Sequence, residues 1–502
     1  MNIALIVPPY ADNDLEMACK ESIGICYLAA VLRDNDFEVT LIDADLLGLT
    51  FHATAERILH GKYDLVGFSV LEGTIESVEA ILQLLVDGGL ESHVLLGGYF
   101  PTMLVEEVLK KLPRVDSVVL GEAEYSLLSL VIALRDGRDW RHLPGVASRI
   151  ADGVTINPCD TPCAVDDLPF PERDLLPEVL RRGGVTGVVG SRGCFEGCSF
   201  CCMNRFSQLS GVVGWRGRSP VSIGDELEQL VEQWGVRAVS FYDGNFIGPG
   251  EQGVERAHAI ADEIIKRNLD LHFAISTRAD QVERELFLHL KNAGLSEVFI
   301  GLESMTQRIL DLYNKHTRVE DNIKAVETLE ECKIYFRAGF ILYEPHITLS
   351  EIRENIEFLA KMVDMHYCNK FFFFKALRVY RGSLMEGKLA RQGILIENNW
   401  HVAYNWKHAE VGEYIRVTGQ ICSQIINIVQ QIQPFEADIK RYFETLLGKW
   451  NIQVHSAVLL MIEHGAISQN SYMDLSVKAA DELKTIRKKL QRYTSIQSRD
   501  VN

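Results

Sequence analysis

The stretch Val185–Cys202, VTGVVGSRGCFEGCSFCC, decides the fold of this 502-residue chain. A short apolar run is followed by Cys194, Cys198 and Cys201, which lie on one loop with Cx3Cx2C spacing. Three thiolates on such a loop can bind three irons of a [4Fe-4S] cubane and leave the fourth iron open for a small ligand. A structural zinc site normally uses four ligands in two pairs, and no matching second pair lies downstream. The spacing therefore favours an iron–sulfur cluster over zinc.

Further apolar runs follow this stretch, and helical patterns separate them. The runs are RAVSFYD, LHFAIST, EVFIGLE, YFRAGFIL and KFFFFKAL. About six strands, each followed by a helix, predict a partial (β/α)6 barrel over residues 181–390. Its active site is expected at the carboxyl ends of the strands. Strand signals fade after that point, which predicts a mostly helical C-terminal domain over residues 391–502.

The region before the cysteine stretch has a second alternating pattern. Its apolar runs are NIALIV, FEVTLID, DLVGFSV, HVLLGG and DSVVLGE. Strands that alternate with helical segments predict a Rossmann-like, flavodoxin-like doubly wound domain over residues 1–150, which makes the chain an α/β protein. A stretch dense in Pro and Asp, residues 151–180, is expected to be a linker.

Composition narrows the classes of function and location. Hydrophobic residues make up 47% and charged residues 24% of the chain, as in ordinary globular proteins. The net charge of −18 opposes binding to nucleic acid. No apolar run reaches the roughly 20 residues that a membrane-spanning helix needs. The start has no basic region before its apolar run, so we expect a cytoplasmic protein without a membrane or nucleic-acid partner.

The cysteine stretch and the segments after it resemble those of the radical S-adenosylmethionine (SAM) superfamily. The matching positions are Phe200 before the third cysteine, WRGRSP after the loop, Asp243 and Asn245 in FYDGNF, Arg278 in STRAD, Glu303 in IGLES, Lys315 in YNKHT, and the turn RVYRGS. The resemblance covers about residues 185–390. It implies that the open iron chelates the amino and carboxylate groups of SAM, and that a reduced cluster cleaves SAM to a 5′-deoxyadenosyl radical.

The same resemblance assigns the SAM-contacting side chains. Arg278 and Glu303 stand where the family holds the charged or ribose groups of SAM, and guanidinium suits a carboxylate. Each can instead be a salt-bridged residue at a strand end. Phe200, Asp243 and Asn245 are also placed near SAM, although Asp and Asn at these positions are equally typical of turns.

The order of the domains resembles the cobalamin-binding class of that superfamily. A doubly wound domain and the linker motif DLPFPERD precede the cysteine stretch. The matching positions in the first domain are Asp43, Asp45, Gly48, Ser69, Leu71, Gly97 and Gly98. Asp45 stands where the family histidine would coordinate cobalt, so the resemblance implies cobalamin without a histidine lower ligand. The alternative is a domain that keeps the fold and binds nothing.

The resemblance implies a cobalamin-dependent radical SAM enzyme. The favoured reaction is methyl transfer to a carbon of a small molecule in natural-product biosynthesis, with an electron donor such as flavodoxin or ferredoxin. One rival is an enzyme of the same architecture that rearranges, dehydrates or cyclises its substrate, with or without cobalamin. Another rival is a non-catalytic cobalamin or iron–sulfur sensor.

Overall fold

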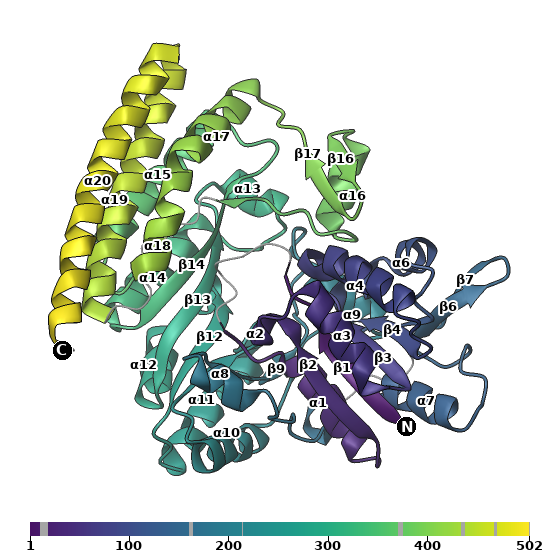
Figure 1. Cartoon of the computed structure of the whole chain (residues 1–502). Coiled ribbons are helices and arrows are strands. Elements are labelled where there is room, and N and C mark those ends of the chain that lie inside the picture. The colour runs from purple at the N-terminus through teal and green to yellow at the C-terminus, as the bar shows by residue number, and fades with distance from the viewer. Residues whose placement is uncertain are drawn as a thin grey trace. The chain divides into compact units, whose positions relative to one another are not determined.

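The N-terminal region forms a seven-stranded sheet with the order β2-β1-β3-β4-β5-β6-β7 (Figure 1). Strands β1 to β5 are parallel, and β6 and β7 extend the sheet as antiparallel strands. The strands are β1 (Asn2–Val7), β2 (Glu38–Asp43), β3 (Leu65–Ser69), β4 (His93–Gly97), β5 (Ser117–Val119), β6 (Val146–Ile150) and β7 (Gly153–Ile156). The order 2-1-3-4-5 is that of a flavodoxin-like sheet, so the predicted α/β class and N-terminal fold are confirmed.

The computed structural model describes residues 1–10, 19–159, 164–212, 214–369, 375–432, 437–465 and 469–500. The chain divides into two units. The first comprises Met1–Ser276, His289–Leu295 and Val379–Ala403. The second comprises Thr277–Leu288, Ser296–Arg378 and Tyr404–Asn502.

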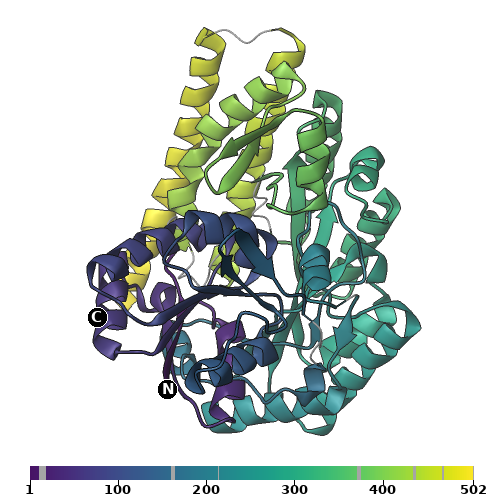
Figure 2. The ribbon, with the colours of Figure 1, turned by 90° about the vertical axis from the view of Figure 1, so that its right-hand side faces the viewer.

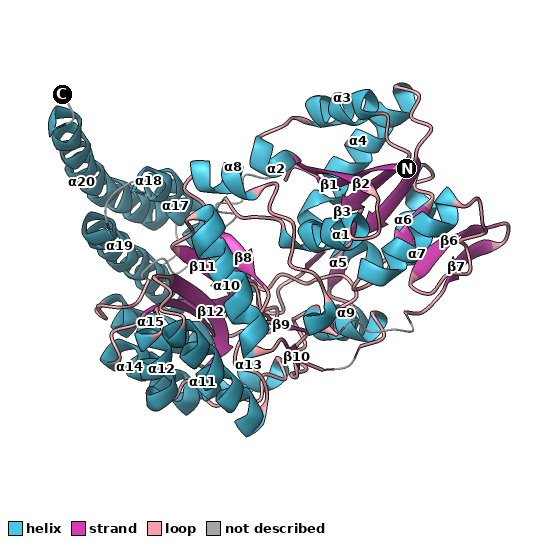
Figure 3. Ribbon diagram, turned by 90° about the horizontal axis from the view of Figure 1, so that it is seen from below, coloured by secondary structure: helices cyan, strands magenta, loops and turns pink. Residues whose placement is uncertain are grey.

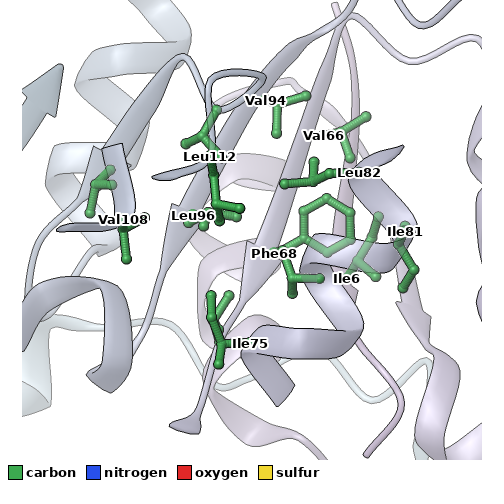
Figure 4. Packing of buried hydrophobic residues seen from close by; sticks show 14 of the residues in the cluster. Ile6, Val66, Phe68, Ile75, Ile81, Leu82, Val94, Leu96, Val108 and Leu112 are labelled. Carbon is green, nitrogen blue, oxygen red and sulfur yellow. The ribbon is translucent and has the colours of Figure 1, made fainter. Parts of the chain in front are cut away.

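Helices cover both faces of the first sheet because its central strands are apolar on both sides (Figure 3). The helices are α1 (Ile23–Arg33), α3 (Phe51–Gly61), α4 (Ile75–Asp87), α6 (Val105–Lys111) and α7 (Glu124–Arg135). Ile3 and Leu5 of β1 join a core with α1 and α7. Ala4 and Ile6, which point to the other face, join a core with α3, α4 and α6. Figure 4 shows part of this second core.

The second sheet has six strands in the order β15-β14-β13-β12-β11-β8. These strands are β8 (Thr186–Val188), β11 (Ala238–Phe241), β12 (His272–Arg278), β13 (Leu295–Glu303), β14 (Tyr335–Tyr343) and β15 (Lys375–Ala376). The pairs β8 with β11, β11 with β12, β13 with β14 and β14 with β15 are parallel. The connecting helices are α10 (Pro220–Trp234), α11 (Gly250–Lys266), α12 (Arg284–Asn292), α13 (Gln307–Leu312), α14 (Val319–Glu331) and α15 (Leu349–Val363). The predicted partial barrel is confirmed, and residues 370–374 of its last predicted strand lie outside the described residues.

The end of the chain is mostly helical, as predicted. Its helices are α17 (Ala409–Cys422), α18 (Ile426–Ile432), α19 (Ala437–Glu463) and α20 (Gln469–Asp500). Figure 2 shows α19 and α20 side by side, and Trp450 Nε1 donates to Ala479 O at 3.1 Å between them. Among the described residues, no helix is both long and apolar enough to span a membrane.

Two antiparallel hairpins differ from the sequence-based expectation. The first consists of β6 and β7, so the first sheet continues into the stretch predicted as a linker. The second consists of β16 (Leu395–Asn398) and β17 (His401–Tyr404), in a region that is expected to be mostly helical. Its strands β16 and β17 are largely exposed, so the alternation of buried and exposed side chains that reveals most strands is missing.

Candidate active site

The cysteine loop begins directly after a two-stranded sheet that follows the second sheet in sequence. After β8, the short strand β9 (Ser191–Arg192) pairs antiparallel with β10 (Arg216–Gly217). Gly193 follows with a φ of +80°, and a Cβ there would lie 2.2 Å from the carbonyl oxygen of Gly214. Only glycine fits such a position. The chain therefore leaves the sheet directly before Cys194.

The three cysteines lie on an irregular segment between β9 and α9 (Met203–Leu209). Cys194, Cys198 and Cys201 are each half-buried. The backbone N–H of Cys201 donates to Cys198 O at 3.2 Å, and the N–H of Met203 donates to Cys201 Sγ at 3.4 Å. A hydrogen bond to a cysteine sulfur, such as that from Met203, helps to set the reduction potential of a bound cluster.

In the part of the chain that the structure describes, no three His, Cys, Asp or Glu side chains converge on a single metal-ion position. A cubane does not need such convergence, because each thiolate binds a different iron. Three half-buried thiols on one irregular loop therefore fit a cluster better than a single zinc ion. Phe200, which lies between Ser199 and Cys201, is also half-buried.

Asp243 and Asn245 follow β11 and support the turn that precedes the cysteine loop. Asp243 Oδ1 accepts from the N–H of Gly190 at 2.8 Å, whereas Asp243 Oδ2 is buried and has no hydrogen-bond partner among the described residues. Burial raises the pKa of the Asp243 carboxyl to about 6, against the opposing effect of Arg256. Asn245 Oδ1 accepts from Gly248 N at 2.7 Å. These contacts are those of turn-forming residues, and Asp243 Oδ2 leaves one buried acceptor for a ligand.

Arg278 and Glu303 come together in the second unit through Lys315. The ammonium of Lys315 lies 3.0 Å from Glu303 Oε1, and the Lys315 carbonyl accepts from Arg278 Nη2 at 2.8 Å. Arg278 also forms a two-point ion pair with Asp280, at 2.9 Å for each bond. Glu303 has a φ of +62°, which is uncommon for a residue other than glycine. Such strain at the end of a strand is characteristic of functional sites.

Gly301 makes room for this charged group. A Cβ at Gly301 would lie 2.6 Å from Glu303 Oε1 and 2.8 Å from the Lys315 ammonium. The carboxylate and the ammonium therefore lie directly over the backbone of β13. The result is a buried arrangement of alternating positive and negative groups at strand ends, which suits a ligand that carries both charges.

The loop after β2 contains the first three residues of the predicted cobalamin set. Asp43 caps the short helix α2 (Ala44–Leu47), with Oδ1 accepting from Leu46 N at 2.9 Å. Burial raises the pKa of Asp43, and hydrogen bonds from Ser22 and Leu46 oppose this effect. Asp45 is exposed and accepts from Tyr10 N at 3.3 Å. Gly48 ends α2 with a φ of +65°. No imidazole stands at position 45.

The loops after β3 and β4 contain the other four. Ser69 and Gly97 end their strands, and Val70 N donates to Gly97 O at 2.8 Å between the two loops. Leu71 is 39% exposed, although its side chain is large and apolar. Gly98 has a φ of +97°, and a Cβ there would lie 2.9 Å from Val70 O. These loops leave the same edge of a parallel sheet, which is the edge at which open α/β sheets bind their ligands.

The sequence-based reasoning missed a contact between these loops and the cysteine segment. Tyr99, directly after Gly98, donates from its hydroxyl to Met203 Sδ at 3.1 Å. It also missed Trp400 of the second hairpin, which is fully buried in the first unit and donates from Nε1 to Glu79 Oε2 at 3.0 Å. Both pairs join residues more than 100 positions apart, so no local pattern could have revealed them.

Two family models match two separate regions of the chain. Residues 188–359 match the radical SAM superfamily, and residues 19–131 match the B12 binding domain. The chain thus contains a radical SAM domain and a B12-binding domain. Its cofactors are accordingly a [4Fe-4S] cluster, SAM and cobalamin.

Individual relatives agree with this assignment. The chain is 29% identical to an uncharacterised methyltransferase of Pyrococcus horikoshii, over 80% of this chain and 85% of that protein. It is also 29% identical to the anaerobic magnesium-protoporphyrin IX monomethyl ester cyclase of Rubrivivax gelatinosus, over 70% of this chain and 64% of that protein. The fold is similar to that of OxsB, a cobalamin-dependent S-adenosylmethionine radical enzyme. That similarity has a TM-score of 0.79 at 18% identity and covers 100% of this chain and 81% of OxsB.

Proposed function

We propose that this protein transfers a methyl group to a carbon of a small-molecule substrate in natural-product biosynthesis. Residues 1–150 would bind cobalamin, residues 151–180 would form a linker, residues 181–390 would carry the cluster and SAM, and residues 391–502 would help to select the substrate. The observation that carries the proposal is the presence of a cysteine loop and a B12-binding domain in one chain. The Pyrococcus relative, a methyltransferase that matches both regions, supports it.

Each cofactor has a set of residues suited to it. Cys194, Cys198 and Cys201 would bind three irons and leave the fourth for SAM. When bound, the cluster and SAM supply a carbon radical, and cobalamin supplies the methyl group. The task of the protein is to orient these groups and to keep water from them.

Arg278 and Glu303 would hold the charged or ribose groups of SAM. Lys315 fixes the carboxylate of Glu303 at 3.0 Å, so the carboxylate is oriented before the ligand arrives. The Arg278 guanidinium is oriented in the same way by Asp280. Asp243, whose second oxygen has no hydrogen-bond partner in the part of the chain that the structure describes, would accept a hydrogen bond from the ligand, and Asn245 and Phe200 would lie beside it.

Asp43, Asp45, Gly48, Ser69, Leu71, Gly97 and Gly98 would line the cobalamin site. Asp45 offers a carboxylate rather than an imidazole, so the lower face of the corrin would have no histidine ligand. Gly97 and Gly98 would let the tail of cobalamin approach the backbone, because a side chain at Gly98 would meet Val70 O. A small electron donor, flavodoxin or ferredoxin, would reduce the cluster.

Product analysis tests the proposal. The anaerobically reconstituted protein is incubated with hydroxocobalamin, a reductant, candidate small-molecule substrates, and SAM whose methyl group is deuterated. We expect S-adenosylhomocysteine together with 5′-deoxyadenosine, and a product that carries the label. Formation of 5′-deoxyadenosine alone, with a product that lacks the label, would exclude methyl transfer.

The second candidate is a ring-forming or rearranging reaction without methyl transfer. The Rubrivivax cyclase, which is as similar to this chain in identity as the methyltransferase, favours it. The two candidates differ in stoichiometry, because only methyl transfer consumes a second SAM. The same labelled experiment therefore separates them.

A further inference from the structure

We propose that Tyr99 is a positioning residue that fixes the turn after β4 relative to the cysteine loop, with Met203 as its partner. The proposal rests on the proposed function, which assigns cobalamin to that turn and the cluster to that loop. All the residues that carry it belong to the first unit.

Tyr99 extends from the predicted cobalamin turn onto the helix that follows the cysteines. It is the first residue of α5 (Tyr99–Met103), and its ring packs on Phe206 of α9 with a centroid distance of 4.1 Å. The hydroxyl lies 3.1 Å from Met203 Sδ, to which it donates. Burial raises the pKa of Tyr99. The phenol therefore keeps its proton and remains a donor beside the loop.

Met203 contacts three segments, one through its backbone and two through its side chain. Its backbone N–H donates to Cys201 Sγ at 3.4 Å, and its Sδ accepts from Tyr99. On a third side, a Cβ at Gly244 would lie 3.1 Å from Met203 Cε, so the methyl group rests against the backbone between Asp243 and Asn245. An unbranched, polarisable thioether is well suited to contact both the hydroxyl of Tyr99 and the backbone at Gly244.

The turn that Tyr99 follows has little freedom of its own. Gly98 has a φ of +97° and approaches Val70 so closely that no side chain fits, and Val70 N donates to Gly97 O at 2.8 Å. A shift of Tyr99 would therefore be passed to the whole turn. Reactions between two bound groups are sensitive to such shifts, since a misplacement of about 1 Å can cost about 100-fold in rate.

Pulsed dipolar electron paramagnetic resonance tests this role without turnover. The protein is loaded with cob(II)alamin and its cluster is reduced, so that the distribution of separations between the two spins can be measured. We expect Tyr99→Phe and Met203→Leu each to widen this distribution relative to the wild type. Because the two substitutions remove the same contact, the double variant should be no wider than the wider single variant.

Matched controls exclude a general effect of either substitution. Tyr125→Phe on α7 and Met473→Leu on α20 change the same residue types at exposed positions, and both should keep the wild-type distribution. Loss of corrinoid or cluster in Tyr99→Phe, with an unchanged circular dichroism spectrum, would also support the proposal. Wild-type distributions in both single variants, with both cofactors bound, would overturn the positioning role alone. A wild-type protein that binds no corrinoid would overturn the proposed function as well.

Discussion

Replacing Arg173 with methionine should destabilise the first unit by about 3–5 kcal/mol, because it breaks a buried charge network by removing one partner. The Arg173 side chain is 7% exposed, and its partners Glu21 and Glu226 are 0% and 1% exposed. Nη1 lies 2.5 Å from Glu21 Oε2, and Nη2 lies 2.6 Å from Glu226 Oε1. Glu226 keeps a second partner in Arg218, whereas the Glu21 carboxylate would keep, among the described side chains, the hydroxyl of Thr186 alone.

The pH dependence of the stability lost in Arg173→Met gives a sharper test than the size of that loss. Burial already raises the pKa of Glu21, and Arg173 opposes that effect. Without Arg173 the pKa of Glu21 should rise further, so the folded variant holds a proton that the unfolded chain releases. Stability then falls as pH rises between the unfolded and the folded pKa. The deficit of the variant should therefore be small in mild acid and largest at neutral pH and above.

Urea unfolding monitored by intrinsic fluorescence measures the effect. The first cooperative transition is compared at constant m, because a chain with several domains need not unfold in one step. Arg33→Met is the matched control, since Arg33 binds Glu172 and Asp174 at the surface, where such pairs contribute about 0–1 kcal/mol. Adding Glu21→Gln to Arg173→Met should recover part of the loss. A deficit equal to that of the control, with no dependence on pH, would refute the reasoning.

Three more substitutions test the site. Cys198→Ala should abolish iron and labile sulfide in the reconstituted protein, whereas the buried Cys332→Ala should keep both, and metal analysis with absorbance spectra decides. Gly98→Ala should weaken hydroxocobalamin binding in an absorbance titration, because strain of about 1–3 kcal/mol would distort the turn. Gly137 also has a positive φ, of +64°, but a Cβ added there would meet no atom within 4 Å, so Gly137→Ala should leave the binding of hydroxocobalamin unchanged. The pKa of about 6 for Asp243 implies that wild-type stability falls as pH rises from about 4 to 6, and Asp243→Asn should remove this slope in urea unfolding.

The sequence predicted the parts of the fold that local pattern controls. The strands of both sheets are continuous apolar runs because they are covered on both faces, so their positions could be read directly. The hairpin of β16 and β17 could not, because its side chains are mostly exposed and its anchor, Trp400, lies in the turn between the strands. A single buried residue in a turn gives no periodicity.

The sequence predicted which residues belong to the site, but it did not predict the contacts between them. The motif segments named Arg278, Glu303 and Lys315, but the bond from Arg278 to the Lys315 carbonyl joins residues 37 positions apart. The φ of +62° at Glu303 likewise leaves no trace in the sequence, since glutamate rarely adopts this conformation. Such features depend on how the ends of separate strands meet.

The segment Val379–Ala403 shows why long-range contacts matter for this architecture. It follows the last barrel strand in sequence but belongs to the first unit. Met385 N donates to Ser199 O of the cysteine loop at 2.8 Å, while the Trp400 ring packs at 5.9 Å from Phe100, the residue after Tyr99. The cysteine loop and the turn after β4 are thus joined twice, directly through Tyr99 and indirectly through this segment. With two independent connections, the cysteine loop cannot rotate freely relative to the turn after β4. Two cofactors held by these two segments would need such a fixed relation in order to act on one substrate.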